Sequence, residues 1–382
     1  MQAADRPYVK GSILTLEMRS PDSKSELQLS DRARELRAGI LDVREPLTRR
    51  VKIIDIFEPS TMSVALIVQL EQEEEQTAPV ALTTPAPIMV LKMYDRQFST
   101  QLREFKETGA ATRASEDQFI DFVRQGSMPR FLKHIDKNGT WKSGKWDVPK
   151  REAYFHVRCT LCHEVELEIY NRLIEMQGVH VPTLFADVRL ASTPPQGLDG
   201  PANGSSVESL TQYTEVRGIL MEYISGFPLN EIVTKTPESD WAPICDQAIE
   251  IVRKITDSDF INSDIQTRNI LVQRVGEEGE DSSYKVFFLD FAQCKFRDPS
   301  DSDEVWRAYK SQRNEEGAVG YVMTTHISRA KGKKGKRYKG PLPLPWEFTP
   351  STRFDGEYIE LCAPVEDLLN SLDSEDSKDS ED

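Results

Sequence analysis

The chain has 382 residues, with 48 Lys or Arg against 63 Asp or Glu, and its formal net charge of −15 argues against non-specific nucleic-acid binding, which needs cations to replace phosphate counterions. Its length allows one large two-lobed domain or two ordinary domains, and a hydrophobic content of 38% indicates that polar loops and tails dilute the core. Because no apolar run reaches roughly 18 residues and the start lacks a signal-peptide pattern, we expect a soluble, intracellular protein without membrane partners.

The first predicted elements are strands. Residues 1–45 are polar and mixed, and we interpret them as an N-terminal extension. Residues 51–56 and 62–70 are rich in β-branched and apolar side chains on either side of Pro59, which predicts a hairpin. After a polar, proline-bearing loop, residues 88–93 predict a third strand that is apolar except for Lys92.

Two helices follow. Residues 115–125 predict a short helix with Ser115 as its N-cap and Gly126 just past its end. Residues 152–177 predict a long helix, because apolar residues recur at spacings of three and four until Gly178. This helix contains Cys159-Thr160-Leu161-Cys162-His163, the spacing used to attach a c-type haem. A short motif inside a helix is weak, and a second Cys or His pair for zinc is missing, so we expect neither haem nor zinc.

In the second half of the chain the predicted elements change from strands to helices. Residues 183–190 and 218–224 predict two strands that flank a loop rich in Gly, Pro and Ser. Helices then dominate, notably 242–256, with two short apolar runs at 269–273 and 286–291. A strand-rich half with one long helix, followed by a helical half with a short hairpin, predicts an α+β fold.

The two ends of this region carry opposite charge. Seven of the eleven residues 329–339 are Lys or Arg, which is typical of a flexible loop or of a nuclear-import or anionic-partner signal. The last residues, 363–382, are strongly acidic, which predicts a solvated tail. We therefore expect a cytoplasmic protein, with nuclear entry as the alternative that the basic segment raises.

Lys92 is the first residue that indicates chemistry. A buried ammonium group is costly unless it is paired or meets an anionic ligand. The long helix offers Glu164, Glu166 and Glu168 as partners. At about 100° per residue, Glu166 and Glu168 flank the apolar stripe on opposite sides, so helical geometry does not choose between these two.

Three further polar residues follow at characteristic spacings. Asp264 and Asn269 are separated as D-x-x-x-x-N on a loop that runs into an apolar strand. Asp290 comes 21 residues after Asn269 and closes the buried run KVFFLDFA. Carboxylate and carboxamide oxygens are hard ligands that suit Mg²⁺ bound together with phosphate oxygens. Asn269 and Asp290 are therefore candidate metal ligands.

In order and spacing these features resemble the protein kinase-like phosphotransferases, most closely a group of fungal protein kinase domain-containing proteins, over about residues 51–323. The resemblance implies a two-lobed α+β fold, in which an antiparallel-sheet N-terminal lobe holds the long helix and the C-terminal lobe is mainly helical. It also implies ATP and Mg²⁺ as cofactors. Lys92 would hold the α and β phosphates, Asp264 would accept the proton of the substrate hydroxyl, and Asn269 and Asp290 would bind Mg²⁺.

The same resemblance suggests further assignments. Glu166 would pair with the lysine, because the family places this glutamate four residues before a Tyr, here Tyr170. Glu222, Tyr223 and Ile224 would form the hinge whose backbone meets the adenine, with Leu220 or Met221 lining the pocket behind it. The implied regions are an extension at 1–45, an N-terminal lobe at 46–224 with insertions at 71–87, 106–150 and 192–212, and a C-terminal lobe at 225–325. A basic segment, 326–362, and a tail, 363–382, follow.

Three departures from the family pattern leave two functions open. Residues 57–63, where the family has glycines over the phosphates, contain none. The catalytic loop has Asn262-Ser263-Asp264 in place of H-R-D, so an active enzyme would not need activation-loop phosphorylation, and no A-P-E triplet follows Asp290. We predict a phosphotransferase that acts on a protein Ser or Thr or on a small molecule. The alternative is a pseudokinase, a nucleotide-binding or scaffold module without catalysis.

Overall fold

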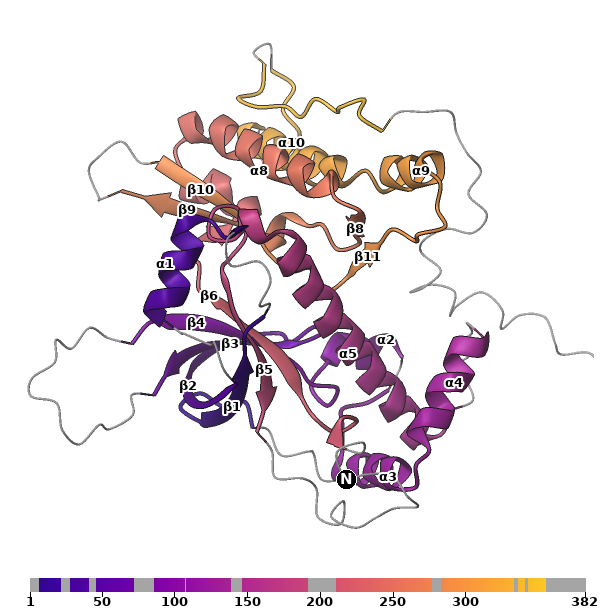
Figure 1. Ribbon diagram of the computed structural model, residues 1–382. Coiled ribbons are helices and arrows are strands. Elements are labelled where there is room, and N and C mark those ends of the chain that lie inside the picture. Colours follow the sequence, from indigo (N-terminus) through magenta and orange to yellow (C-terminus); the bar gives the residue numbers. More distant parts are fainter. Residues whose placement is uncertain are drawn as a thin grey trace, which may run out of the picture.

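The computed structural model of the protein describes residues 7–21, 28–40, 46–71, 86–106, 108–138, 146–191, 211–276, 283–332, 336–340 and 343–354. These residues form a strand-rich N-terminal lobe and a mainly helical C-terminal lobe, with one long helix leading from the first lobe to the second (Figure 1). The predicted two-lobed α+β architecture is confirmed. No helix within the described ranges has the length and apolar character needed to cross a bilayer.

The N-terminal lobe is built on a closed antiparallel barrel in the order β1-β2-β3-β4-β6-β5. Its strands are β1 (Ile13–Arg19), β2 (Leu47–Phe57), β3 (Val64–Leu70), β4 (Ile88–Tyr94), β5 (Leu184–Leu190) and β6 (Arg217–Glu222). Alternate side chains such as Leu16, Ile53, Leu66 and Leu91 fill the barrel interior with no exposed area. The strands predicted at 51–56, 62–70, 88–93, 183–190 and 218–224 are all present.

Residues 13–19 and 31–40 belong to this lobe, which differs from the interpretation of residues 1–45 as an extension. β1 pairs with β2 and β5 and so closes the barrel. Its sequence, ILTLEMR, alternates apolar and polar residues, which is the pattern of a half-buried strand. A ten-residue helix, α1 (Asp31–Ile40), follows and lies beside the barrel (Figure 1).

Four α-helices are described between β4 and β5. They are α2 (Thr100–Phe105), α3 (Arg113–Arg124), α4 (Met128–Asn138) and α5 (Val148–Arg172). The predicted N-cap of α3 is wrong by three residues: Thr112 is the cap, and its hydroxyl accepts a hydrogen bond from the Ser115 backbone while Ser115 answers in the reciprocal direction. Helix α5 is the predicted long helix, shifted toward the N-terminus by its cap Asp147. A 3₁₀ turn (Ile174–Met176) and Gly178, at φ +72°, end it.

The C-terminal lobe packs helices against two small sheets. Its elements are β7 (Phe227–Pro228), α7 (Ile232–Lys235), α8 (Trp241–Thr256), β8 (Phe260–Asn262), β9 (Ile270–Val275), β10 (Ser283–Phe288), β11 (Cys294–Phe296), α9 (Asp303–Arg313) and α10 (Glu315–Lys331). Antiparallel pairing gives the sheets β10-β9-β7 and β11-β8. The predicted helix 242–256 and the short hairpin are confirmed.

The C-terminal lobe extends past residue 325. Helix α10 runs to Lys331, and Trp346 and Phe348 are buried in the same core as α8 and α10. The predicted basic segment 329–339 thus begins inside a helix, although residues 333–335 lie outside the described ranges. The predicted acidic tail, 363–382, also lies outside them.

Candidate active site

Lys92 lies between two carboxylates. It is on β4, with 8% of its surface exposed, and its Nζ donates to Glu166 Oε2 at 2.7 Å and to Asp290 Oδ1 at 2.8 Å. Burial by itself lowers the pKa of Lys92, but Asp290 and Glu166 together raise that pKa well above its usual value. The lysine is therefore charged at every physiological pH.

The structure selects Glu166 among the three helix glutamates. Glu166 is fully buried on α5, where its Oε1 accepts from the Phe291 backbone at 3.3 Å. Glu168 instead pairs with Arg172 on the same helix, at 2.8 Å, and Glu164 with Arg217, at 3.3 Å; both of these carboxylates are about half exposed. The position of β4 against α5 makes this choice.

Asp264 is held by its own loop, which follows β8. Its backbone N–H donates to Asn262 Oδ1 at 2.8 Å, and Gln266 Nε2 donates to its Oδ1 at 2.5 Å. Asn269 Nδ2 donates to the Asp264 carbonyl at 3.0 Å. Burial, followed by repulsion from Asp290, raises the pKa of Asp264, which makes its carboxylate a stronger base.

Asp290 follows β10 in a left-handed backbone conformation, with φ +65°. Aspartate is one of the few residue types that adopt this conformation without glycine's freedom. Asn262 Nδ2 donates to the Asp290 carbonyl at 3.2 Å, so the Asp264 loop and Asp290 are joined directly. Burial favours the neutral acid, but Lys92 holds the pKa of Asp290 below its usual value, and the side chain is ionised.

These side chains line one cleft between the lobes. Its walls are Lys92, Asp264, Asn269 and Asp290, together with Arg268 and residues 61–63 of the β2–β3 loop. In the described part of the chain, no three His, Cys, Asp or Glu side chains gather into a complete metal site. Mg²⁺ commonly takes one or two protein ligands and completes its shell with water and substrate phosphates. The oxygens of Asn269 and Asp290 fit that mode of binding.

The glycine-free β2–β3 loop is fixed by the start of α2. Ser99 Oγ donates to the Met62 carbonyl at 2.9 Å, and the Gln101 backbone donates to the Thr61 carbonyl at 3.3 Å. Met62 and Ser63 are buried. Hydrogen bonds to the start of α2 therefore fix the backbone of the segment that lies next to Lys92.

The predicted hinge lies apart from this cleft. Glu222 ends β6, and its buried carboxylate accepts from the Thr183 backbone at 3.0 Å and from Thr183 Oγ1 at 2.9 Å. Its side chain is thus committed to protein groups, which leaves the backbone of Glu222, Tyr223 and Ile224 as the part that could meet a base. Leu220 packs in the barrel core and Met221 in the core of the C-terminal lobe, and neither lines the cleft around Lys92.

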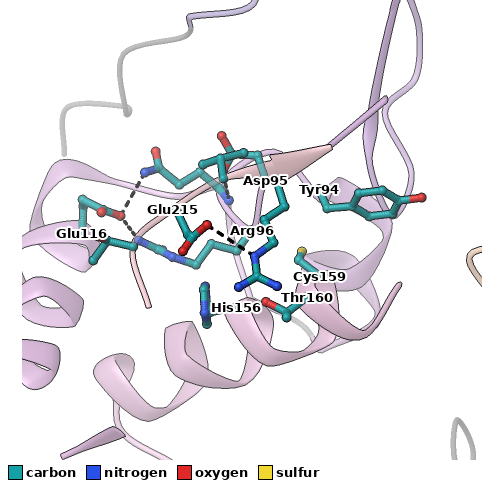
Figure 2. Close-up of a pocket in the computed structure, with 12 residues that line it drawn as sticks. Tyr94, Asp95, Arg96, Glu116, His156, Cys159, Thr160 and Glu215 are labelled. Carbon is teal, nitrogen blue, oxygen red and sulfur yellow. Dashed lines mark hydrogen bonds and ion pairs between the residues drawn. The ribbon is translucent and has the colours of Figure 1, made fainter. Parts of the chain in front are cut away.

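A second polar pocket lies beyond the C-terminal end of β4, where Arg96 and Glu116 meet and His156, Cys159 and Thr160 project from α5 (Figure 2). Its volume of about 30 Å³ accommodates a water molecule and is far too small for a nucleotide. Behind it, Arg96 and Arg103 both donate to Glu152 Oε2 at 2.6 Å. This buried network, which the sequence did not reveal, ties the chain after β4 to the first turns of α5.

Three side chains of the haem-like motif, Cys159, Cys162 and His163, face protein groups. Cys159 and Cys162 are buried in the cluster that joins α3 to α5, and Cys159 Sγ lies 3.1 Å from Ser99 Oγ. His163 Nε2 lies 3.0 Å from Asp187 Oδ1. The spacing follows from one face of a buried helix, so these side chains belong to the packing of the N-terminal lobe.

The two-lobed fold and this constellation resemble the protein kinase-like pattern that the sequence suggests. No known family model matches the chain. The chain is 29% identical to the KEOPS complex subunit Bud32 of Pyrococcus abyssi over 87 residues, which are 23% of this chain and 36% of that protein. The chain thus spans about a third of this curated relative. The predicted likeness to fungal proteins stays a prediction.

Three solved structures are similar at low identity. The Rio2 kinase of Chaetomium thermophilum, in an ADP/Mg²⁺-phosphoaspartate complex, has 13% identity and a TM-score of 0.37, over 77% of this chain and 60% of that one. WaaP in complex with acyl carrier protein has 11% identity and a TM-score of 0.33, over 72% and 77%. The PknI kinase domain of Mycobacterium tuberculosis has 10% identity and a TM-score of 0.30, over 73% and 74%.

Proposed function

We propose that the protein is an ATP- and Mg²⁺-dependent phosphotransferase that transfers the γ-phosphoryl group of ATP to a hydroxyl of a protein Ser or Thr or of a small molecule. The observation that carries the proposal is the buried Lys92, held between Glu166 and Asp290 in the cleft that also contains Asp264 and Asn269. Five polar groups from both lobes converge there, at a desolvation cost that barrel packing alone does not require.

The residues divide the chemistry among themselves. Lys92 binds the α and β phosphates and is oriented by Glu166. Asp264 takes the proton from the attacking hydroxyl as that oxygen bonds to the γ phosphorus, and the bond from phosphorus to the β-phosphate oxygen breaks to release ADP. Asn269 and Asp290 would hold Mg²⁺, which when bound neutralises phosphate charge. Positioning and charge neutralisation supply most of the rate.

A pseudokinase is the second candidate function. It is favoured by the β2–β3 loop, which contains no glycine that would let its backbone N–H groups cradle phosphates. The 2.5 Å contact from Gln266 also occupies one of the two carboxylate oxygens of Asp264. In this alternative the protein binds nucleotide without turnover.

Phosphoryl transfer from γ-labelled ATP decides between the two functions. Purified wild type is incubated with Mg²⁺ and either generic basic proteins or a pooled metabolite extract, beside Asp264→Asn, Asp290→Asn and the control Asp259→Asn, whose carboxylate is exposed. We expect label transfer by the wild type and the control, and loss of at least about a hundredfold in both site variants.

Binding measured in parallel gives each result its meaning. Asp264→Asn should retain ATP affinity, because that residue contacts the acceptor and not the nucleotide. Transfer by Asp264→Asn at the wild-type rate would contradict the role of the base. ATP binding without transfer to any acceptor would support the pseudokinase.

A further inference from the structure

Helix α1 is joined to the predicted hinge by Arg32. The guanidinium Nη1 donates to Glu222 Oε2 at 3.2 Å, and Nη2 donates to Glu222 Oε1, so the contact is bidentate. Nη1 also donates to the Gly178 carbonyl at 2.5 Å. One side chain from α1 thus reaches both the end of β6 and the turn that follows α5.

Glu222 depends on these donors. Only 7% of its surface is exposed, and a buried carboxylate needs hydrogen bonds on both oxygens to offset its desolvation. Thr183 supplies two of them to Oε2, and Arg32 donates to Oε1 and supplies the compensating charge. The direction of the Glu222 side chain, and with it the backbone that leads into Tyr223, is set by this arrangement.

The rest of α1 is docked on the same connecting segments. Arg37 Nε donates to the Leu184 carbonyl at 2.8 Å, and Ser30 Oγ donates to the Gln177 carbonyl at 2.5 Å. The Arg32 guanidinium also lies 5.8 Å from the ring centre of Phe287 on β10, in the other lobe. Helix α1 therefore braces the predicted hinge, and its contacts reach the strand that precedes Asp290.

We propose that Arg32 is a positioning residue for the nucleotide: by holding Glu222 it fixes the backbone of residues 222–224 against the adenine base. The inference rests on the proposed function. Adenine and guanine present opposite hydrogen-bonding groups at the 6-position, an amino donor and a carbonyl acceptor, and a backbone group discriminates between them only when its position is fixed. Arg32 thus governs ATP affinity and the preference for ATP over GTP, and leaves phosphoryl transfer itself unaffected.

The test compares Arg32→Ala with Arg34→Ala, a control on the same helix whose guanidinium is half exposed and pairs with Asp31 at 2.9 Å. ATP and GTP affinities are measured by calorimetry on the full chain, and kcat and KM by the transfer assay. We expect Arg32→Ala to weaken ATP binding on the order of tenfold, or about 1.4 kcal/mol, and to reduce the ATP-to-GTP ratio. Its kcat at saturating ATP should stay within about twofold of wild type, and Arg34→Ala should match wild type.

Two further variants protect the test against a loss of folding. Arg32→Lys keeps the charge but not the bidentate contact, and Thr183→Val removes one other donor to the same carboxylate; both should weaken ATP binding less than Arg32→Ala. If ATP affinity and nucleotide preference are unchanged in all three variants, the inference is overturned and the proposed function is not. Loss of kcat with unchanged affinity also overturns it. Absence of ATP binding by the wild type removes the proposed function and the inference together.

Discussion

Glu152 gives the sharpest test of how the site is supported. Its side chain is about 2% exposed, and its Oε2 accepts from Arg96 and Arg103 at 2.6 Å each. The Arg103 and Arg96 side chains are 3% and 9% exposed, so neither guanidinium can turn to water for compensation. Glu152→Gln keeps the shape of the side chain and removes its charge.

The magnitude follows from what is left unpaired. Removing one partner of a buried ion pair costs about 3–5 kcal/mol, because the remaining charge stays buried. Arg96 keeps its second carboxylate, Glu116, so the loss falls mainly on Arg103 and we expect the low end, about 3 kcal/mol. For a domain of 150–250 residues this is a fall in Tm of roughly 6–12 °C.

Urea and thermal denaturation followed by circular dichroism measure this loss. Glu116→Gln is the matched control, because Glu116 is 28% exposed and meets only Arg96 of the two guanidiniums; it should cost about 1 kcal/mol or less. A Glu152→Gln variant within about 1 kcal/mol of wild type would refute the reasoning, since breaking a buried pair costs several times more. Equal losses in the two variants would refute it as well.

Three other outcomes are expected. Glu166→Gln should reduce phosphoryl transfer at least about tenfold, because it releases the strand lysine, whereas Glu168→Gln on the surface of the same helix should leave turnover unchanged; equal rates in the labelled-ATP assay would contradict the pairing. Burial raises the pKa of Asp264, whereas the guanidinium of Arg268, 3.9 Å away, lowers the pKa of the same carboxyl. Arg268→Gln should therefore move the acidic limb of the kcat/KM profile to higher pH, because the carboxylate is the active form. Burial and two guanidiniums lower the pKa of His156 to about 3, so below about pH 6.5 the unfolded chain binds a proton at this residue that the folded chain does not bind. The free energy of unfolding should therefore decrease as the pH falls, by up to about 1.4 kcal/mol per pH unit. His156→Gln should flatten this dependence in denaturation midpoints measured between about pH 6.5 and 5.

The residues closest to the chemistry could be predicted because their signals are local. Lys92 interrupts an apolar strand, and Asp264, Asn269 and Asp290 stand at fixed spacings beside short apolar runs. The structure brings all four to one cleft. Each strand or loop carries its own side chain to a defined end of an element, so short-range pattern suffices to name the candidates.

Supporting residues could not be predicted, because their partners are far away in the chain. Arg96 and Glu152 are 56 residues apart, and Arg32 and Glu222 are 190 apart. On the surface of an isolated helix or strand, such residues look like ordinary solvated charges. The N-cap of α3 was misplaced for a milder reason: Thr112 and Ser115 both have capping side chains, and the geometry of the turn decides between them.

The sequence by itself determined the positions of the strands of the N-terminal lobe from β2 onward, the long helix, and four of the polar side chains that line the cleft, since these depend on periodicity and on the cost of polar groups in apolar runs. Only the tertiary structure decided that Glu166 answers Lys92, that β1 closes the barrel, and that α1 braces the hinge. Helical periodicity placed Glu166 and Glu168 equally close to the apolar stripe. Tertiary packing decides between the two glutamates. It places the carboxylates of Glu166 and Asp290 against the buried ammonium group of Lys92, and it leaves Glu168 at the surface beside Arg172.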